Sequence, residues 1–591
     1  MGGNSKPVKV IKGGAFLVES LEPAEIFTPE DITEEQHMFA QTAEEFLRKE
    51  VIPQEEGIYA KDYRVHRSLM RKAGELGLLS IDIPEAYGGL GLNKVSSSVV
   101  GEQFALQASF AGTQSSHVNI GTLPIVFFGT EQQKHKYLPK LATGEWIGAY
   151  ALTEPGSGSD ALAAKTKAVL SADGMHYILN GQKMWITNGG LADLFTVFAK
   201  VDGEKFTAFL VERGPGLVHG HEEKKLGIDG SSTTALMLED CRVPAENVLG
   251  EIGRGHKIAF NVLNIGRLKL GARSVGAMKV ALGQAAKYAR ERHQFGQPIS
   301  NFGLIKHKLA EMAIRCYVGE SILYRTAGVI DEALAGVDKN DPRQVLKVLE
   351  QYAAECSIIK AWESEALGYV VDEEVQVFGG YGYSKDYPAE RNYRDARIAR
   401  IYEGTNEINR IVIGSQLLRR AKSGELPLLE ADAKLDGWTF FTPQGENADG
   451  FAGERALLGS AKMMTLASIA VAETAYGEHV RDEQEVLGLI AEMTMDVYAM
   501  ESTLLRTRAI VGARGADRSK IQTDICRVFV RDAVARVERA AGLVGAETGA
   551  GGNTTAHAMM SGLNQSAPFK AIAARRRISD SIADAGRYNF G

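Results

Sequence analysis

Residues 167–188 read KAVLSADGMHYILNGQKMWITN, and this stretch decides the fold class of the chain. Apolar and polar residues alternate along it with the period of a β-strand, and Asp173-Gly174 and Asn180-Gly181 are pairs that favour tight hairpin turns. Similar β-rich runs follow, one of them around Asp202-Gly203. The pattern predicts an antiparallel β domain, which we place at residues 146–250.

Helical periodicity lies on both sides of this β domain. Apolar residues recur every three or four positions before it, and the segments after it are long enough for an up-and-down bundle of four helices. The chain is therefore expected to be mainly α-helical with a central β domain. The predicted parts are an N-terminal extension (1–32), an N-terminal helical domain (33–145), the β domain (146–250), a four-helix-bundle domain (251–421), a linker (422–450) and a C-terminal helical domain (451–591).

Charge and cysteine content exclude several classes of protein. The 591 residues carry a formal net charge of −7, which argues against a general nucleic-acid binder. The charge is uneven, because residues 501–591 carry +6 and the rest −13. The four cysteines lie far apart without zinc or disulfide spacing, so we expect a reducing compartment and no metal site.

The first residues of the chain and its apolar runs bear on where the protein is located. The first residues have no apolar core of a secretory signal and no arginine of a transit peptide, and no run of 18 apolar residues occurs in the chain. An initial Met1 without a presequence fits a cytoplasmic bacterial protein. A mitochondrial location is expected instead if this is the mature form of a eukaryotic protein.

Residues 153–160 read TEPGSGSD and directly follow a predicted strand. Gly156 and Gly158 let a ligand approach the backbone, and hydroxyl groups such as those of Thr153 and Ser159 can donate hydrogen bonds to phosphate or polar ring atoms. Taken alone, the segment is explained more simply as a plain loop. The glycine spacing also mimics a dinucleotide fingerprint, which we reject because β-hairpins follow it instead of a helix.

Trp185 and Thr187 and the segment RERHQFGQPI (290–299) are further candidates for ligand binding. Two residues apart on a strand, Trp185 and Thr187 share a face that suits a flat heterocycle, although a core tryptophan beside a surface threonine is the simpler explanation. Arg292 could bind a pyrophosphate through paired hydrogen bonds, or it could be a solvated arginine at a helix end.

Glu403 lies in RIYEGTNEINR (400–410), after long helices and before another helical run. Burial beside its apolar neighbours would raise its pKa and make it a stronger base, whereas most glutamates are simply solvated. The segment VQVFGGYGY (375–383) ends a predicted helix at a glycine pair. That pair is either a helix cap or a place where backbone packs against a cofactor.

Together and in this order, these segments resemble the acyl-CoA dehydrogenase family. The resemblance covers about residues 34–420, and TEPGSGSD, KMWITNGG, RERHQFGQPI, VQVFGGYGY and IYEGTNEINR carry it. The helical tail after residue 421 resembles that of the very-long-chain branch.

The resemblance implies a role for individual residues. It makes Glu403 the catalytic base, with Gly404 beside the substrate. It places FAD between the β domain and the bundle, against Tyr150, Leu152, Thr153, Gly158, Ser159, Trp185, Ile186, Thr187, Arg292, Phe295, Gln376, Val377, Phe378, Gly379, Gly380, Thr405, Asn406 and Glu407. It places the acyl-CoA against Ser159, Asn264, Ile265, Gly266, Arg267 and Gly404.

The activity implied by the resemblance is FAD-dependent dehydrogenation of long-chain acyl-CoA to trans-2-enoyl-CoA in fatty acid β-oxidation. Electrons would pass to an electron-transferring flavoprotein, and the enzyme would be a homodimer whose FAD site is partly built by the neighbouring subunit. Two alternatives share the fold. One is an acyl-CoA oxidase that uses oxygen, and the other is a scaffold or assembly factor with little catalytic activity.

Chain length and membrane binding are two further expectations. Gly121 and Thr122 are small, which favours a deep acyl pocket, whereas Pro124 departs from the very-long-chain pattern. The positive charge of the tail, with Arg575-Arg576-Arg577, suits peripheral binding to anionic lipid, and residues 545–565 could form a membrane-binding hairpin. A solvated basic helix with a loop explains the same residues.

Overall fold

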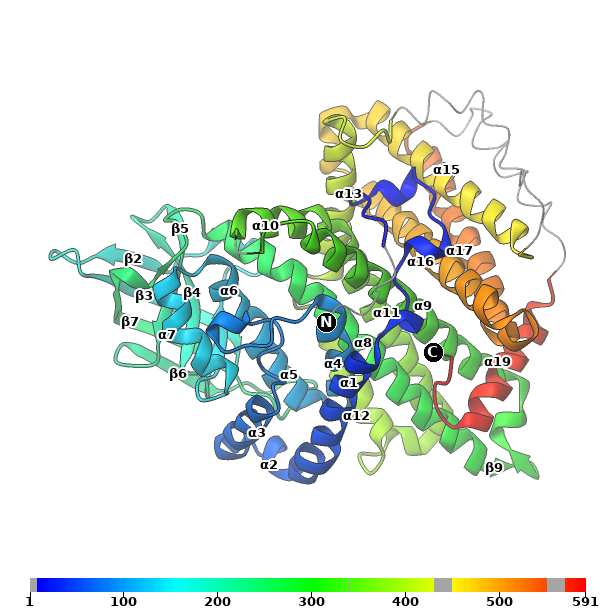
Figure 1. Ribbon diagram of the computed structural model, residues 1–591, viewed down its shortest axis with the longest axis horizontal. Coiled ribbons are helices and arrows are strands. Elements are labelled where there is room, and N and C mark those ends of the chain that lie inside the picture. Colours follow the sequence, from blue (N-terminus) through cyan, green and yellow to red (C-terminus); the bar gives the residue numbers. More distant parts are fainter. Residues whose placement is uncertain (1–7, 340, 430–448, 550–568, 591) are drawn as a thin grey trace.

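The computed structural model describes residues 8–339, 341–429, 449–549 and 569–590, and it is built from helices around one large sheet (Figure 1). The sheet lies at one end of the molecule, the long helices of the bundle cross the middle, and the C-terminal helices lie at the other end. This arrangement confirms the expected fold class, mainly α-helical with a central β domain.

The helices before the sheet begin with α1, and a capping box between Thr33 and Gln36 closes its first turn. The Thr33 hydroxyl accepts a hydrogen bond from the Gln36 amide, and the Gln36 side chain accepts one from the Thr33 amide. A π-helical turn, Leu47–Val51, continues α1. The helices are α1 (Glu34–Phe46), α2 (Glu55–Tyr59), α3 (Tyr63–Glu75), α4 (Lys94–Gln103), α5 (Ala108–Ser116), α6 (Leu123–Phe128) and α7 (Glu131–Ala142).

The sheet has the strand order β6-β7-β3-β2-β4-β5-β8, with β1 on β4. Most neighbours are antiparallel, as predicted, while β4 pairs in parallel with both β1 and β2. The strands are β1 (Gly148–Ala151), β2 (Lys167–Leu170), β3 (His176–Thr187), β4 (Leu194–Val201), β5 (Lys205–Glu212), β6 (Leu217–Glu222), β7 (Thr233–Pro244) and β8 (Val248–Leu249).

Two of the three predicted hairpin turns are present. Gly174 and Asp202-Gly203 have positive φ at the β2–β3 and β4–β5 connections. The turn predicted at Asn180-Gly181 is wrong, because both residues lie inside β3, where the pairing with β7 is irregular. The Asn180 side chain exchanges two hydrogen bonds with Asp240 of β7, so pairing across the sheet overrides the local turn preference.

The bundle follows the sheet and is built on the 37-residue helix α8. Between α8 and α9, a small hairpin of β9 (His293–Gln294) and β10 (Gln297–Pro298) turns at Phe295-Gly296, both with positive φ. The helices are α8 (Gly255–Glu291), α9 (Gly303–Ala335), α10 (Pro342–Gln351), α11 (Ala353–Phe378), α12 (Pro388–Ala396) and α13 (Asn406–Lys422).

The C-terminal helices pack against α9 and α13 and against the N-terminal extension. Residues 15–17 at the start of the chain lie on α15 and α16, where the Phe16 and Tyr498 rings are 4.7 Å apart (Figure 1). The helices are α15 (Ala452–Tyr476), α16 (Gln484–Arg514), α17 (Lys520–Glu547) and α19 (Ala571–Ala585).

One stretch among the described residues, Ala452–Arg481, is long and apolar enough by composition to cross a membrane. More than half of its most apolar window is buried inside the protein, against α16 and α17. A core helix meets the same criterion of length and composition, and this burial explains the apolar sequence without a membrane.

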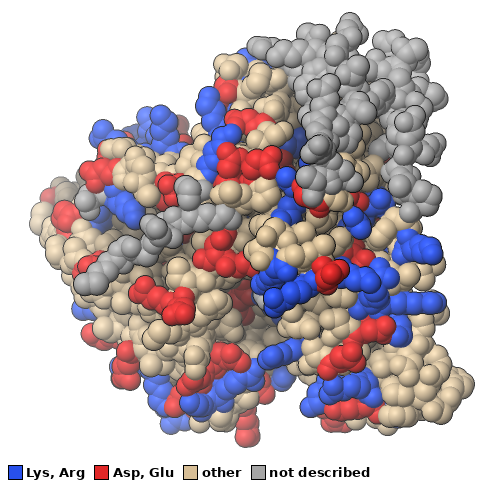
Figure 2. Space-filling model, turned by 45° about the vertical axis from the view of Figure 1, so that its right-hand side comes forward, with Lys and Arg blue, Asp and Glu red and all other residues tan. Residues whose placement is uncertain are grey.

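The tail presents less free positive charge than its sequence suggests. Arg575 forms ion pairs with Glu311 and Asp532, and Arg577 forms one with Asp524. Figure 2 accordingly shows lysine and arginine interspersed with acidic residues rather than one continuous basic patch. Most of the predicted membrane-binding segment, residues 550–565, lies outside the described part of the chain.

Candidate active site

Glu403 lies in the short connection before α13, in a backbone conformation that glycine usually adopts. Its φ is 59°, and Gly404 follows with φ of 81°. The next residue, Thr405, caps α13 by accepting a hydrogen bond from the Ile408 amide. A non-glycine residue with positive φ is uncommon and is often found at functional sites.

The Glu403 side chain points at α8. A Cβ atom added to Gly266 would lie 3.2 Å from Glu403 Oε2, so any larger residue would crowd the carboxylate and require it to shift. One residue further, Arg267 Nε donates a hydrogen bond to the Glu403 carbonyl at 3.1 Å. These contacts fix the loop and the carboxylate against one face of α8.

Burial sets the proton affinity of this carboxylate. It raises the pKa of Glu403 above its ordinary value, while the positive charges of Arg267, Arg273 and Lys360 act in the opposite direction. Lys360 is itself buried and donates to Asn406 Oδ1 at 2.6 Å, and burial lowers the pKa of Lys360 to about 7. A carboxylate with a raised pKa is the better general base.

Tyr150 of β1 brings the sheet to the same place. Its hydroxyl is buried and has no hydrogen-bond partner among the described residues. Burial, followed by the charge of Glu403, raises the pKa of Tyr150 well above its ordinary value, so the two side chains lie near each other. A buried hydroxyl left unpaired by the protein is a donor for a bound ligand.

A buried ion pair holds the loop 153–160 against β3. Lys183 Nζ lies 2.7 Å from Glu154 Oε1, and the Glu154 carboxylate also accepts from the Lys165 and Thr166 amides. The pair fixes the backbone of the loop while its own side chains remain inside the protein.

The outer side of this loop and of β3 is open. Ideal Cβ atoms on Gly156 and Gly158 would meet nothing within 4 Å, and Ser159 is exposed. Trp185 lies at an irregularity in β3 with φ of 60° and is 57% exposed, which is unusual for so large an aromatic side chain. An open glycine loop beside an exposed aromatic ring fits a flat ring system such as isoalloxazine.

A cavity begins one helical turn along α8 from Gly266. About 660 Å³ of space lies between its lining residues, part of it open to solvent. Tyr402, the neighbour of Glu403, lines it together with Arg273, Asn392 and Asp395. Its apolar lining residues are Ala105, Ala108, Ala111, Ile228, Leu270, Ala277, Val280, Leu367, Val371, Ala396 and Ala399.

A second group of predicted cofactor residues lies elsewhere. Arg292, Val377, Phe378, Gly379 and Gly380 line one open groove, in which the Arg292 guanidinium lies 5.5 Å from the Tyr381 ring centre. No described residue forms an ion pair with this guanidinium, so it is free for an anion. The groove adjoins β9, which Figure 1 places at the opposite end of the molecule from the sheet.

Comparisons with known proteins identify the family. Three sequence families, described as the N-terminal, middle and C-terminal domains of acyl-CoA dehydrogenase, match residues 33–145, 149–241 and 253–418. A fourth, also described as an acyl-CoA dehydrogenase C-terminal domain, matches residues 460–564. A probable acyl-CoA dehydrogenase of Bacillus subtilis is 45% identical over 99% of this chain and 99% of its own length. The chain belongs to the acyl-CoA dehydrogenase family.

Two further members of the acyl-CoA dehydrogenase family are informative. The very long-chain specific mitochondrial acyl-CoA dehydrogenase of Bos taurus is 37% identical over 80% of this chain and 74% of that protein. The crystal structure of a Bacillus anthracis acyl-CoA dehydrogenase complexed with FAD is 46% identical, with a TM-score of 0.95 over 98% of this chain and all of that chain. The family therefore extends over the C-terminal helices as well.

Some residues that the resemblance to this family assigned to ligands have other surroundings. Ile186 and Ile265 are buried in hydrophobic cores, so only their backbone is available to a ligand. Asn264 accepts a hydrogen bond from Arg267. Asn406 is buried among Lys360, Ser364 and Glu365, whereas Glu407 is exposed in the first turn of α13.

Gly121 has a structural reason for being small. A Cβ atom added there would lie 2.8 Å from the carbonyl carbon of Gly148, so β1 packs directly on it. The contact with β1 therefore explains the small residue at position 121. Its effect on the depth of an acyl pocket stays a prediction. Val118 and Asn119 of the same segment instead line a second cavity, described below.

Sequence reasoning missed four residues of the site. The positive charges of Lys360 and Arg273 lower the pKa of Glu403. Both residues lie in helices whose apolar periodicity predicts only burial, and no nearby motif indicates that they act at this site. Glu154 and Lys183 stood inside the quoted motifs, but their pairing was not predicted, because residues 29 positions apart meet only in the folded sheet.

Proposed function

We propose that this chain is an FAD-dependent acyl-CoA dehydrogenase that converts long-chain acyl-CoA thioesters to trans-2-enoyl-CoA. The observation that carries the proposal is Glu403, a carboxylate with a burial-raised pKa that lies between the orphaned hydroxyl of Tyr150 and the largely apolar cavity along α8. The extent of similarity to the very long-chain specific enzyme supports the long-chain preference.

In the proposed reaction, Glu403 removes a proton from the α-carbon of the thioester. Its backbone amide donates a hydrogen bond to the thioester carbonyl, which stabilises the developing negative charge. FAD, when bound, accepts the hydride from the β-carbon. Arg267 and Gly266 keep the carboxylate in place, and an acyl chain in the cavity excludes water and strengthens the base.

The cofactor fits two separate places in one chain. The open surface at Trp185, Gly156 and Gly158 suits the isoalloxazine ring, and the free Arg292 beside Gly379 suits a pyrophosphate. Figure 1 draws β9, which follows Arg292 in the chain, far from strand β3, which carries Trp185, and we infer that one FAD does not reach both places within a single chain. A homodimer in which each subunit completes the other's site resolves this, and it is part of the proposal.

The electron acceptor and location are also proposed from the resemblance. Electrons pass to an electron-transferring flavoprotein, and the protein acts in the bacterial cytoplasm. Peripheral membrane binding through the C-terminal domain stays a prediction, with Arg575 and Arg577 contributing little because both are paired.

The decisive experiment is anaerobic bleaching of the flavin by saturated acyl-CoAs from C4 to C20. We expect bleaching that is strongest with long chains, and rapid reoxidation by electron-transferring flavoprotein but slow reoxidation by air. Fast reoxidation by air would make the protein an oxidase. A purified protein that stays colourless with FAD would favour the scaffold alternative.

A further inference from the structure

We propose that Arg273 is a gate that governs how well long acyl chains are accepted, an inference that rests on the proposed function. Arg273 lies two helical turns along α8 from Gly266, the neighbour of Glu403, and it borders two cavities at once. One is the cavity that begins near Glu403, and the other lies between α8 and the N-terminal helices. The guanidinium stands where the two approach each other.

The position of Arg273 along α8 places it in the path of a long chain. Seven residues separate it from Gly266, a distance of about 10 Å along a helix. An acyl chain whose thioester lies at Glu403 and that follows α8 past Leu270 therefore reaches the guanidinium before its end, if the chain is long. A short chain ends before it.

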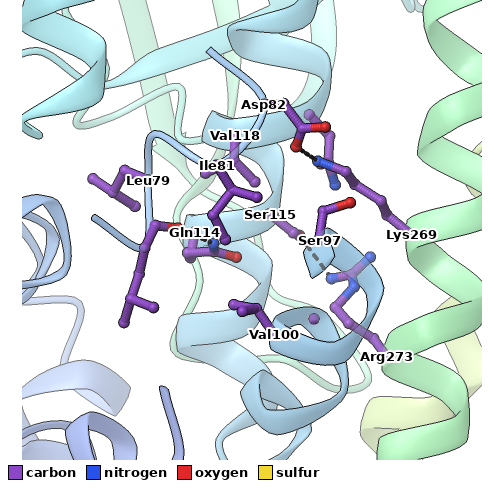
Figure 3. Close-up of a pocket in the computed structure, with 13 residues that line it drawn as sticks. Leu79, Ile81, Asp82, Ser97, Val100, Gln114, Ser115, Val118, Lys269 and Arg273 are labelled. Carbon is purple, nitrogen blue, oxygen red and sulfur yellow. Dashed lines mark hydrogen bonds and ion pairs between the residues drawn. The ribbon is translucent and has the colours of Figure 1, made fainter. Parts of the chain in front are cut away.

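The second cavity is small, and Arg273 is one of the residues that line it. Leu79, Ile81, Val100 and Val118 supply apolar walls on one of its sides (Figure 3), so a long chain meets apolar surroundings there once the guanidinium is displaced. Another side is ionic, because Asp82 pairs with Lys94 and Lys269. One carboxylate faces two ammonium groups, so this side keeps a net positive charge. Arg273 is the cation among the described residues that lines both cavities.

A single hydrogen bond holds the gate closed. Arg273 Nη1 donates to Ser115 Oγ at 2.7 Å, which links α8 to the end of α5 across the gap between the two helices (Figure 3). Arg273 Nε is buried and has no partner among the described residues. The side chain is therefore anchored at one nitrogen only, and its displacement breaks one bond to a charged group.

The gate discriminates by the cost of burying charge. An apolar chain that passes Arg273 must either press against the guanidinium, which removes its remaining hydration, or push it away from Ser115. Both costs apply only to chains long enough to reach it. Chain-length preference is therefore expected to depend on this residue, whereas reactivity at Glu403 is shared by all substrates.

The test compares Arg273→Ala and Arg273→Met with the wild-type holoenzyme. We expect the ratio of kcat/KM for C16 acyl-CoA to that for C8 acyl-CoA to rise about tenfold in both variants, as loss of one charged hydrogen bond allows. Any effect of the lost charge on the pKa of Glu403 is common to both substrates and cancels in the ratio. Lys287→Ala removes an exposed cation from the same helix and should leave the ratio unchanged.

Several outcomes separate the gate from the proposed function. If no saturated acyl-CoA bleaches the wild-type flavin, the proposed function fails. If the wild type is bleached but the ratio stays constant in the variants, the gate is wrong. Arg273→Met keeps most of the side-chain volume. If the alanine variant does not fold, the methionine variant alone tests the gate. A wild-type preference for acyl groups with a terminal carboxylate, lost in both variants, would also overturn the gate, because Arg273 would then bind an anion.

Discussion

At the scale of single residues, Glu403 combines a strained backbone with a partly buried carboxylate. Its positive φ costs of the order of 1–3 kcal/mol for a residue other than glycine. The Arg267 hydrogen bond to its carbonyl and the Thr405 cap on α13 offset this cost and hold the loop in place. The conformation aims the carboxylate at Gly266, where a larger residue would crowd it.

Replacing Glu403 by glutamine should remove the base and keep the shape of the site. We expect flavin bleaching by acyl-CoA to slow by about 10²–10⁴-fold, the usual contribution of a general base. FAD content, measured by absorbance, should not change. Glu246→Gln, at an exposed position before β8, is the matched control and should keep full activity. Retained bleaching in the Glu403 variant would place the base on another residue.

The pH dependence of the reaction should report the charges around Glu403. Only the ionised carboxylate can accept the α-proton, so kcat/KM should fall as the pH falls through the burial-raised pKa of Glu403. Lys360 lowers the pKa of Glu403, so Lys360→Met should raise it and move the acid limb to higher pH. Lys287→Met should leave the limb in place. A Lys360 variant with the wild-type profile would show that its charge does not act on the base.

At the scale of elements, the Glu154–Lys183 pair joins the loop 153–160 to strand β3. Lys183 has no exposed side-chain surface, and it also donates to the Leu152 carbonyl. Ser157, a further hydroxyl of this loop, donates to the Asp160 carbonyl inside the loop. The loop is therefore held from inside, which leaves Gly158 and Ser159 exposed for a cofactor.

Lys183→Met should therefore loosen the loop and weaken FAD binding. It leaves the Glu154 carboxylate buried without its cation, which typically costs about 3–5 kcal/mol of stability. The loss should appear in urea unfolding, and FAD should be released more readily on dilution. Lys205 of β5 forms an exposed ion pair with Asp202 in the preceding turn. Lys205→Met breaks this pair and should change neither the stability to urea nor the release of FAD measurably. Equal effects of the two substitutions would contradict this interpretation of the pair.

At the scale of the whole molecule, Arg506 of α16 ties the C-terminal helices to the rest of the chain. It is fully buried and pairs with Glu30 of the N-terminal extension and with Glu320 of α9. Its guanidinium also lies 4.1 Å from the ring centre of Tyr317. Three segments far apart in the sequence therefore meet at one cation.

Arg506→Met should destabilise the attachment of the C-terminal helices. The partly buried Glu30 loses its cation, while the buried Glu320 keeps its ion pair with Lys279. We expect the free energy of unfolding, measured with urea, to fall by about 1.5–3 kcal/mol, the usual contribution of a hydrogen bond to a charged group. Limited proteolysis should then cut first between the bundle and the C-terminal helices. Arg576→Met on the exposed face of α19 should be indistinguishable from the wild type. If Arg506→Met is as stable as the control, the network does not hold the domains together.

Much of the organisation could be predicted from sequence because it depends on local periodicity. The three- and four-residue repeats predicted the helices on both sides of the sheet, and Asp202-Gly203 predicted a hairpin turn that is present. The turn at Asn180-Gly181 was wrong, since β3 continues through it and pairs with β7. The local preference of Asn-Gly for a turn stabilises the chain less than the pairing of β3 with β7, which a turn at this position would interrupt.

The sequence by itself determined the order of helical and β-rich parts and singled out Glu403, Trp185 and Arg292, because each stands in a motif that can be recognised locally. Only the tertiary structure decided what surrounds them. It brought Gly266, Arg273 and Lys360 to Glu403, and it placed Arg292 at the far end of the molecule from Trp185. Burial and charge at a site are sums over residues distant in sequence, and those sums exist only once the chain is folded.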